Sequence, residues 1–364
     1  MVKLNFEHAA HAEHFYHRYM TWCNSLYEDY DLDKSPVVQE CSTGIPVISW
    51  WNLDLIKNTD SKIIFVDSVL EGANIFEQAL TKQTLDQYPS DKHYVFLSNG
   101  NFSQLDFPMS YTYDVIQIQY VLHMLPMIAN DTTTYGYCYH DTSNWISEEK
   151  PFLFYSIIGQ RRSERNAFIR EVKKHFKPDQ YIMKYDGELL THTFKNTYLQ
   201  HPYQSMNAKN DSLPGLQRVA VHRMSYNVTR QCHFNFFVDT CPLSRDNFGF
   251  ISAHPGHSFI DQKPFVVVGA PGMLRDCHTA GFRTWSELWD ESYDQEPDFH
   301  KRLDMCMQVA KSLQSFDWAG NKQKLQEIAN HNVLNVIASH KTSIKEFERF
   351  ENCIKSLAER NLLC

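Results

Sequence analysis

The sequence contains none of the short motifs that most directly identify a nucleotide-binding or hydrolytic protein. It has no Walker A sequence, no G-x-G-x-x-G, no H-E-x-x-H and no G-x-S-x-G. No stretch reaches the roughly 18 continuous apolar residues of a membrane span, because polar residues and a proline interrupt the nearest candidate, residues 115–129. Nucleoside triphosphate, dinucleotide, zinc-protease and serine-hydrolase functions therefore lack their simplest support, and we expect no membrane span.

Positive charge and paired cysteines are scarce as well. The 35 lysine and arginine residues are outnumbered by 43 acidic residues, which leaves a net charge of -8 and argues against nucleic acid as a partner. The nine cysteines include no C-x-x-C pair, so buried, reduced thiols are predicted rather than a zinc knuckle or a disulfide framework. Residues 1–15 lack the apolar segment of a secretory signal. A cytoplasmic location is the resulting expectation.

Four histidines recur every three residues near the start of the chain, at His8, His11, His14 and His17. On a helix, steps of three residues drift by about 60° each, so the four side chains cannot converge on one ion. A solvated amphipathic helix is therefore favoured over a metal site, and no metal site is predicted.

The length of the chain, 364 residues, suits two domains of roughly 150 to 200 residues each. The pattern becomes polar and irregular at residues 135–150, where we place the linker. The predicted domains are residues 1–145 and residues 150–364. Helical patterns are predicted near the end of the second domain, at 299–314, 320–339 and 343–361.

Short apolar runs in the first domain predict strands at residues 62–67 and 93–98, with helical spacing at 74–80 between them. Strand, helix, strand at this spacing is typical of an α/β layer with parallel pairing. Asp67 and Glu71 would then lie at the carboxyl end of a strand, where open α/β sheets bind their ligands.

The second domain shows the same alternation. Three buried-type strands are predicted, at 152–158, 233–238 and 263–268. A turn with arginines follows the first strand, and a helix comes next, with Phe168, Ile169, Val172 and Phe176 on one face. The whole chain is therefore assigned to the α/β class.

Three segments of this domain also carry unusual residue patterns. They are residues 152–172, residues 233–240 with 249–274, and residues 281–294 (GFRTWSELWDESYD). Their order resembles the donor domain of fucosyltransferase-like and exostosin-like glycosyltransferases. It is most similar to divergent glycosyltransferase-like proteins of bacteriophages and large DNA viruses. The resemblance implies a GT-B-like fold, in which two Rossmann-like domains face each other across a cleft, with C-terminal helices.

By that likeness, the C-terminal domain would bind the nucleotide-sugar donor. The implied binding residues are Arg161, Arg162, Arg165, Asp239, Ser252, His254, His257 and Lys263. Arginine suits the task because its planar guanidinium group binds phosphate oxygens in pairs, where the charge of the leaving diphosphate develops. A solvated helix start is the competing interpretation of the three arginines.

The sequence departs from the resembled proteins at a position that matters for donor binding. Those proteins carry a G-[YF]-[IV]-[ST]-E-K element, whose glutamate binds ribose hydroxyls and whose lysine contacts the diphosphate. Here the Glu-Lys pair is replaced by Ala253 and His254, and a later lysine by His257. Alanine cannot bind a hydroxyl through its side chain, and histidine carries a full charge only when protonated. Either the histidines take over the diphosphate contact, or the fold persists without catalysis.

The function implied by the resemblance is sugar transfer from a nucleotide-sugar donor to a hydroxyl of a glycan or another acceptor, with inversion. Asp67 or Glu71 of the N-terminal, acceptor-type domain would act as the general base. The nucleotide sugar would be a substrate, and no tightly bound cofactor is expected. The alternative is a catalytically inactive protein with a binding or virion-associated structural role. Sugar transfer to modified DNA bases is disfavoured by the acidic charge balance.

Two further patterns, at residues 290–294 and 269–272, predict structural features. The carboxylates of Asp290, Glu291 and Asp294 could hold a divalent metal, but a capping role that orients the domain is favoured. The Gly269-Ala270-Pro271-Gly272 turn predicts a close-approach loop, where glycine lets backbone N–H groups face a ligand.

Overall fold

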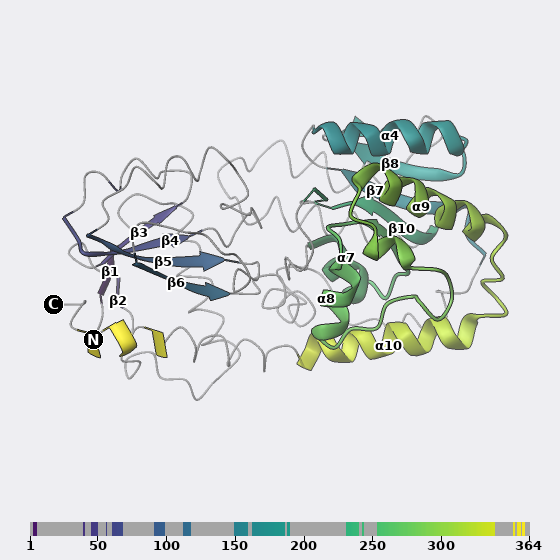
Figure 1. Cartoon of the computed structure of the whole chain (residues 1–364). Coiled ribbons are helices and arrows are strands. Elements are labelled where there is room, and N and C mark those ends of the chain that lie inside the picture. The colour runs from purple at the N-terminus through teal and green to yellow at the C-terminus, as the bar shows by residue number, and fades with distance from the viewer. Residues whose placement is uncertain are drawn as a thin grey trace, which may run out of the picture. The chain divides into compact units, whose positions relative to one another are not determined.

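The computed structural model describes two groups of secondary-structure elements (Figure 1). The described residues are 3–5, 39–40, 45–49, 56, 60–67, 91–98, 112–117, 149–158, 162–185, 188–189, 231–239, 242–243, 253–338, 352–353, 355–357 and 359–360. Both groups are built on mainly parallel sheets, so the predicted α/β class is confirmed. The histidines near the start, the helix at 74–80 and nearly all of the predicted linker lie outside the described residues.

Contacts divide the chain into two compact units. The first comprises Met1–His123, Phe248–Phe250 and Ser339–Cys364, and the second comprises Met124–Asn247 and Ile251–Ala338. This grouping differs from the predicted division at residues 124–145, 248–250 and 339–364. The predicted domain boundaries stay a prediction.

The first unit contains a six-stranded sheet in which every neighbouring pair is parallel. Its strands are β1 (Lys3–Asn5), β2 (Gln39–Glu40), β3 (Ile45–Ser49), β4 (Ile63–Asp67), β5 (His93–Ser98) and β6 (Thr112–Gln117). The order across the sheet is β2-β1-β3-β4-β5-β6. The predicted strands at 62–67 and 93–98 are confirmed as β4 and β5, whose apolar side chains are buried.

The second unit contains a five-stranded sheet in the order β11-β10-β7-β8-β9. Its strands are β7 (Phe152–Ile158), β8 (Tyr181–Tyr185), β9 (Glu188–Leu189), β10 (Cys232–Val238) and β11 (Phe265–Val268). All neighbours are parallel except β8 and β9. The three strands predicted for this unit are confirmed as β7, β10 and β11, while β8 and β9 were not predicted.

Helices cover both faces of this second sheet (Figure 1). On one face lies α4 (Ser163–His175), whose predicted apolar face is buried and whose Phe168 ring packs 4.8 Å from the Phe236 ring of β10. On the other face lies α7 (Ala253–Ile260), where His254 stacks on Phe237 of β10. Successive strand residues point to opposite faces, so one strand anchors both helix layers.

The C-terminal helices were predicted well where the structure describes them. The first is α9 (Phe299–Ser312), continued by η4 (Leu313–Ser315), and the second is α10 (Lys322–Ala338). Of the pattern at 343–361, only seven residues are described. No described helix combines the length and the apolar character that a bilayer span requires.

Three short helices escaped prediction, namely α7, α8 (Met273–Thr279) and η3 (Ser292–Gln295). Proline and glycine inside residues 253–260 argue against a helix on local grounds. Pro255, however, occupies the first turn of α7, where the missing N–H would have had no helical partner. The helix is therefore compatible with its sequence, but packing on β10 and β11 decides it.

Candidate functional site

The strand order of the second sheet defines where a ligand would bind. From β7 the chain moves outward through β8 and β9, and then returns to place β10 and β11 on the other side of β7. The order therefore reverses between β7 and β10. In doubly wound α/β sheets, ligands bind outside the carboxyl ends of the strands at this switch point. The parallel pairing of Asn235 with Tyr155 brings the ends of both strands to the same edge.

Asp239 stands at this edge, directly after β10. Its backbone N–H donates to the carbonyl oxygen of Val268 at 3.1 Å, which ties it to the end of β11. The side chain is 1% exposed, and neither carboxylate oxygen has a hydrogen-bond partner in the described part of the chain. The imidazole Nδ1 of His254 lies 3.8 Å from Oδ1. A buried carboxylate without donors is costly, and a bound group with N–H or O–H donors would offset that cost.

His254 is held beside Asp239 by the first turn of α7. Its ring is stacked on Phe237, with ring centroids 5.0 Å apart and an interplanar angle of 30°. The Ser258 hydroxyl donates to the carbonyl of His254 at 3.0 Å and accepts from the Asn235 amide at 2.9 Å. These contacts fasten α7 to β10. His257, three residues further along α7, is half-buried.

The two described arginines of the predicted donor site lie at the start of α4, the helix that follows β7. Arg162 is the residue before the first helical turn and is half-buried. Arg165 is 6% exposed, so a solvated helix start does not describe it. Because β7 and β10 end at the same edge, the start of α4 belongs to the same region as Asp239. The exposed N–H groups of a helix N-terminus also favour anions. Arg161 and Ser252 lie outside the described residues.

Lys263 lies at the opposite end of the sheet. Its backbone N–H donates to Ser258 at 2.8 Å, just before β11 begins, and its side chain is fully buried. Its charge acts on His233 at the start of β10 and on Asp261. The structure thus does not bring Lys263 together with Asp239 and His254. This placement does not support a donor site that contains all three residues. Lys263 was chosen because its spacing in the sequence resembles that of the family. That spacing does not show that Lys263 lies before the start of β11, at its amino end, whereas Asp239 lies after the carboxyl end of β10.

The two catalytic candidates belong to the first unit. Asp67 is the last residue of β4, in register with Ser49 of β3 and Leu97 of β5. It therefore lies at the carboxyl edge of that sheet, as predicted. The strand order reverses between β1 and β3, next to β4. Glu71 lies outside the described residues.

The glycine turn after β11 is used for packing. A Cβ atom on Gly269 would meet the Met273 sulfur at 2.3 Å, and Gly272 has a left-handed φ of 78°. The N–H of Gly272 donates to the carbonyl of Asp294 at 2.7 Å. This N–H is therefore already satisfied within the protein, so the ligand-facing role expected for the turn does not apply to Gly272.

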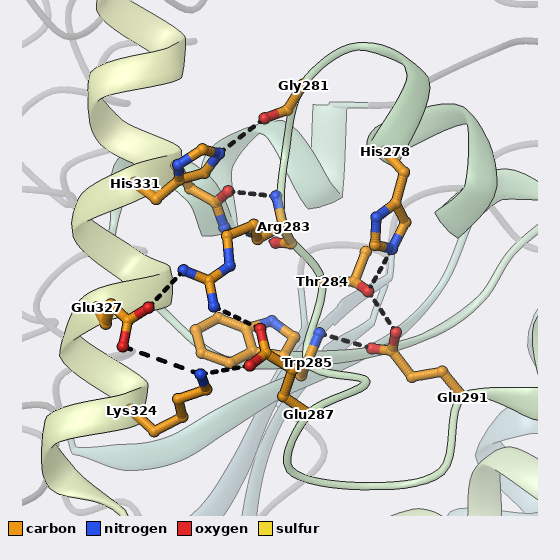
Figure 2. A network of polar contacts seen from close by, with 11 residues as sticks. His278, Gly281, Arg283, Thr284, Trp285, Glu287, Glu291, Lys324, Glu327 and His331 are labelled. Atoms are coloured by element: carbon orange, nitrogen blue, oxygen red, sulfur yellow. Dashed lines mark hydrogen bonds and ion pairs between the residues drawn. The ribbon is translucent and has the colours of Figure 1, made fainter.

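The DESYD segment has the capping role that was favoured. The Asp294 carboxylate accepts hydrogen bonds from the backbone N–H groups of Leu274 at 2.8 Å and of Arg275 at 3.3 Å, both in the first turn of α8, where N–H groups lack a partner within the helix and need a cap. Glu291 accepts from the Thr284 hydroxyl and from the Trp285 backbone (Figure 2). Among the described residues, no group of three or more acidic, histidine or cysteine side chains could hold a metal ion.

The strand order of the second sheet matches that of a doubly wound α/β unit. No family model and no curated protein matches the chain. It is similar to a crystal structure of an α1,3-fucosyltransferase, with 13% identity and a TM-score of 0.40 over 94% of this chain and 90% of that one. Two α1,3-fucosyltransferase structures, one with GDP and one with GDP-fucose, show 10% identity and TM-scores of 0.39 and 0.37. They cover 94% of this chain and 90% and 89% of theirs.

These identities and scores are too low for a shared fold or activity to be inferred. None of these similarities bears on the predicted relation to phage and viral proteins.

Proposed function

We propose that the protein is a glycosyltransferase that binds a nucleotide sugar at the switch point of the second sheet and transfers the sugar to a hydroxyl acceptor. The observation that carries this proposal is the buried Asp239 carboxylate, whose oxygens have no hydrogen-bond donors among the described residues. It stands beside His254, at the edge where the helix carrying Arg165 begins.

A nucleotide sugar suits the distribution of charge along this edge. Its hydroxyl and base N–H groups are donors, which suit a carboxylate such as Asp239 that accepts no hydrogen bond from the described residues. Its diphosphate is an acceptor with negative charge, which suits Arg162, Arg165 and the N-terminus of α4. The proposal therefore places the hydroxyl-rich or base end of the donor toward β10 and the diphosphate toward α4. His254, His257, Arg161 and Ser252 complete the proposed donor site.

Sugar transfer also needs a base and a leaving-group site. When the glycosidic bond breaks, negative charge develops on the diphosphate, and the arginines would stabilise it. In the proposed GT-B-like arrangement, the first unit faces the donor across a cleft and binds the acceptor. Asp67 or Glu71 would remove the proton of the attacking hydroxyl, and a single displacement would invert the anomeric centre.

A catalytically inactive protein with the same fold is the second candidate. It is favoured by Ala253, which offers no side-chain hydrogen bond where the resembled proteins carry glutamate. If this candidate holds, the native chain binds no sugar nucleotide, whereas the double variant Ala253→Glu, His254→Lys gains measurable binding. Binding by the native chain would exclude it as stated.

The variant Asp239→Asn tests the proposed donor site, with Asp304→Asn on the exposed side of α9 as the matched control. Calorimetric titration with GDP-sugars and UDP-sugars should show that Asp239→Asn weakens the preferred donor about tenfold or more, because a charged acceptor is lost. The free variant should melt at a higher temperature than the native protein, since a costly buried charge is removed.

The control should change neither quantity. Absence of saturable binding by the native protein at millimolar sugar nucleotide would overturn the donor site. Unchanged affinity in Asp239→Asn would remove Asp239 from it. Release of nucleoside diphosphate that depends on an added acceptor would then separate transfer from binding alone.

A further inference from the structure

We propose that Arg302 is a positioning residue for Asp239, a role that rests on the proposed donor site. Arg302 lies on α9, which packs against β11 and α4. Its side chain is only 1% exposed. Nothing in the sequence pattern distinguishes it from a solvated arginine in an amphipathic helix.

The guanidinium group of Arg302 joins two chain segments. One Nη atom donates to the carbonyl of Pro242, and the other donates to the carbonyl of Glu296. Pro242 follows Asp239 by three residues, so the first contact holds the chain in place shortly after the candidate carboxylate. The second contact holds the chain between η3 and α9. One buried side chain thus connects the segment after the candidate carboxylate to the body of the unit.

The same guanidinium group also acts on the segment after β11. Its positive charge interacts with the Asp294 carboxylate, which caps the first turn of α8. The chain reaches α8 directly from the end of β11. The segments that leave β10 and β11 at the candidate edge are therefore both anchored around Arg302. The guanidinium group presents its two Nη donors in a rigid planar fork, and the single nitrogen of a lysine ammonium group cannot reproduce that geometry.

The physical cost of this arrangement supports a specific role. Burial lowers the pKa of Arg302, although the nearby Cys306, Asp294 and Glu296 act against that shift. Its Nε has no hydrogen-bond partner in the described part of the chain. An apolar residue would fill the same space without burying a charge. We infer that Arg302 fixes the position of Asp239, which an apolar residue of the same size would not do.

The test compares Arg302→Lys and Arg302→Gln with Leu325→Ala, a buried position on a different helix, α10. Hydrogen–deuterium exchange of the peptide 238–243 should become about tenfold faster in both arginine variants. Affinity for the sugar nucleotide should fall about tenfold at temperatures well below melting. Leu325→Ala should lower the melting temperature while leaving both readouts unchanged.

The outcomes separate this inference from the proposed function. Faster exchange at 238–243 in a protein that binds no sugar nucleotide would support the positioning role and overturn the donor site. Unchanged exchange in both arginine variants would overturn the positioning role, whatever the native protein binds. Equal loss of affinity in Leu325→Ala and the arginine variants would show that Arg302 only stabilises the fold. That result would also overturn the positioning role.

Discussion

Two buried carboxyl groups of the second unit hold their protons at unusually high pH. Burial raises the pKa of Asp261 to about 7, and the nearby charge of Lys263 acts against that shift. Burial also raises the pKa of Glu291 to about 7, with hydrogen bonds from Thr284 and Trp285 opposing and the negative charge of Asp294 adding to the shift. Both groups therefore titrate near neutral pH instead of near pH 4.

This shift predicts that the native fold loses stability as the pH rises from about 4 to about 7. In that window the folded state holds protons that the unfolded chain has already released, so deprotonation opposes folding. The double variant Asp261→Asn, Glu291→Gln should lose less stability than the native protein between pH 5 and pH 8, measured by urea unfolding at each pH.

Glu287→Gln is the control for this experiment, because ion pairs lower the pKa of the exposed Glu287. It should not flatten the pH dependence. A double variant that follows the native pH profile would contradict the prediction.

Among the elements, α10 shows how a helix is fixed to a loop by polar contacts. The Asn332 amide is 1% exposed; its oxygen accepts from the Arg283 backbone N–H at 2.8 Å, and its nitrogen donates to the Arg283 carbonyl at 2.8 Å. On the surface nearby, Arg283 and Lys324 form ion pairs with Glu287 and Glu327 (Figure 2). The buried pair of hydrogen bonds should matter more, because exposed ion pairs contribute little.

Asn332→Ala should therefore lower the free energy of unfolding by about 1–3 kcal/mol, since it leaves two partly buried backbone groups of Arg283 without these hydrogen bonds. Chemical denaturation gives this value directly. Glu327→Gln, which removes only exposed ion pairs on the same helix, should leave the stability unchanged within the precision of the measurement. A larger loss in Glu327→Gln than in Asn332→Ala would show that the surface network holds the helix.

The elements also show which sequence signals suffice. The β7 strand and the α4 helix were predictable because a continuous apolar run and a 3.6-residue periodicity report burial locally. The α7 helix was missed because glycine, proline and histidine weaken the local signal, and α8 was missed because it is only seven residues long. The Asp294 cap of α8 comes from a residue that follows the helix by many positions, so no pattern at the start of α8 indicates it.

At the scale of the whole molecule, the C-terminal residues are part of the first unit, which also contains the N-terminal strands. The Arg360 guanidinium donates to the Asp114 carboxylate of β6 at 2.8 Å, and the buried His93 ring of β5 lies 2.8 Å from the same carboxylate. Burial acts to raise the pKa of Asp114, but these two partners outweigh it and the pKa is lowered. The contact grouping likewise assigns residues 339–364 to the first unit.

Removal of residues 339–364 should therefore destabilise the first sheet selectively. We expect amide exchange in β5 and β6 to become roughly tenfold faster while exchange in β7 and β10 stays unchanged. Mass spectrometry of peptides from both sheets makes the comparison within one sample. Equal acceleration in both sheets would show that the C-terminal residues support the whole chain rather than the first unit.

The sequence by itself determined the α/β class, the main strands and helices, and the presence of polar residues after strand ends. These features depend on alternation and periodicity over a few residues, which the chain displays wherever a segment is buried on one or both faces. Asp67 could be chosen in this way, because it ends a strand that the apolar run predicts, whereas Asp239 was chosen through the family resemblance.

Only the tertiary structure decided which of these ends are neighbours. The order β11-β10-β7-β8-β9 places Asp239 beside the start of α4 and puts Lys263 at the opposite edge. The same packing buries Arg302 against a carbonyl sixty residues away in the chain. Strand order and such contacts depend on pairings between distant segments, and local residue patterns carry no information about which distant segment becomes the partner.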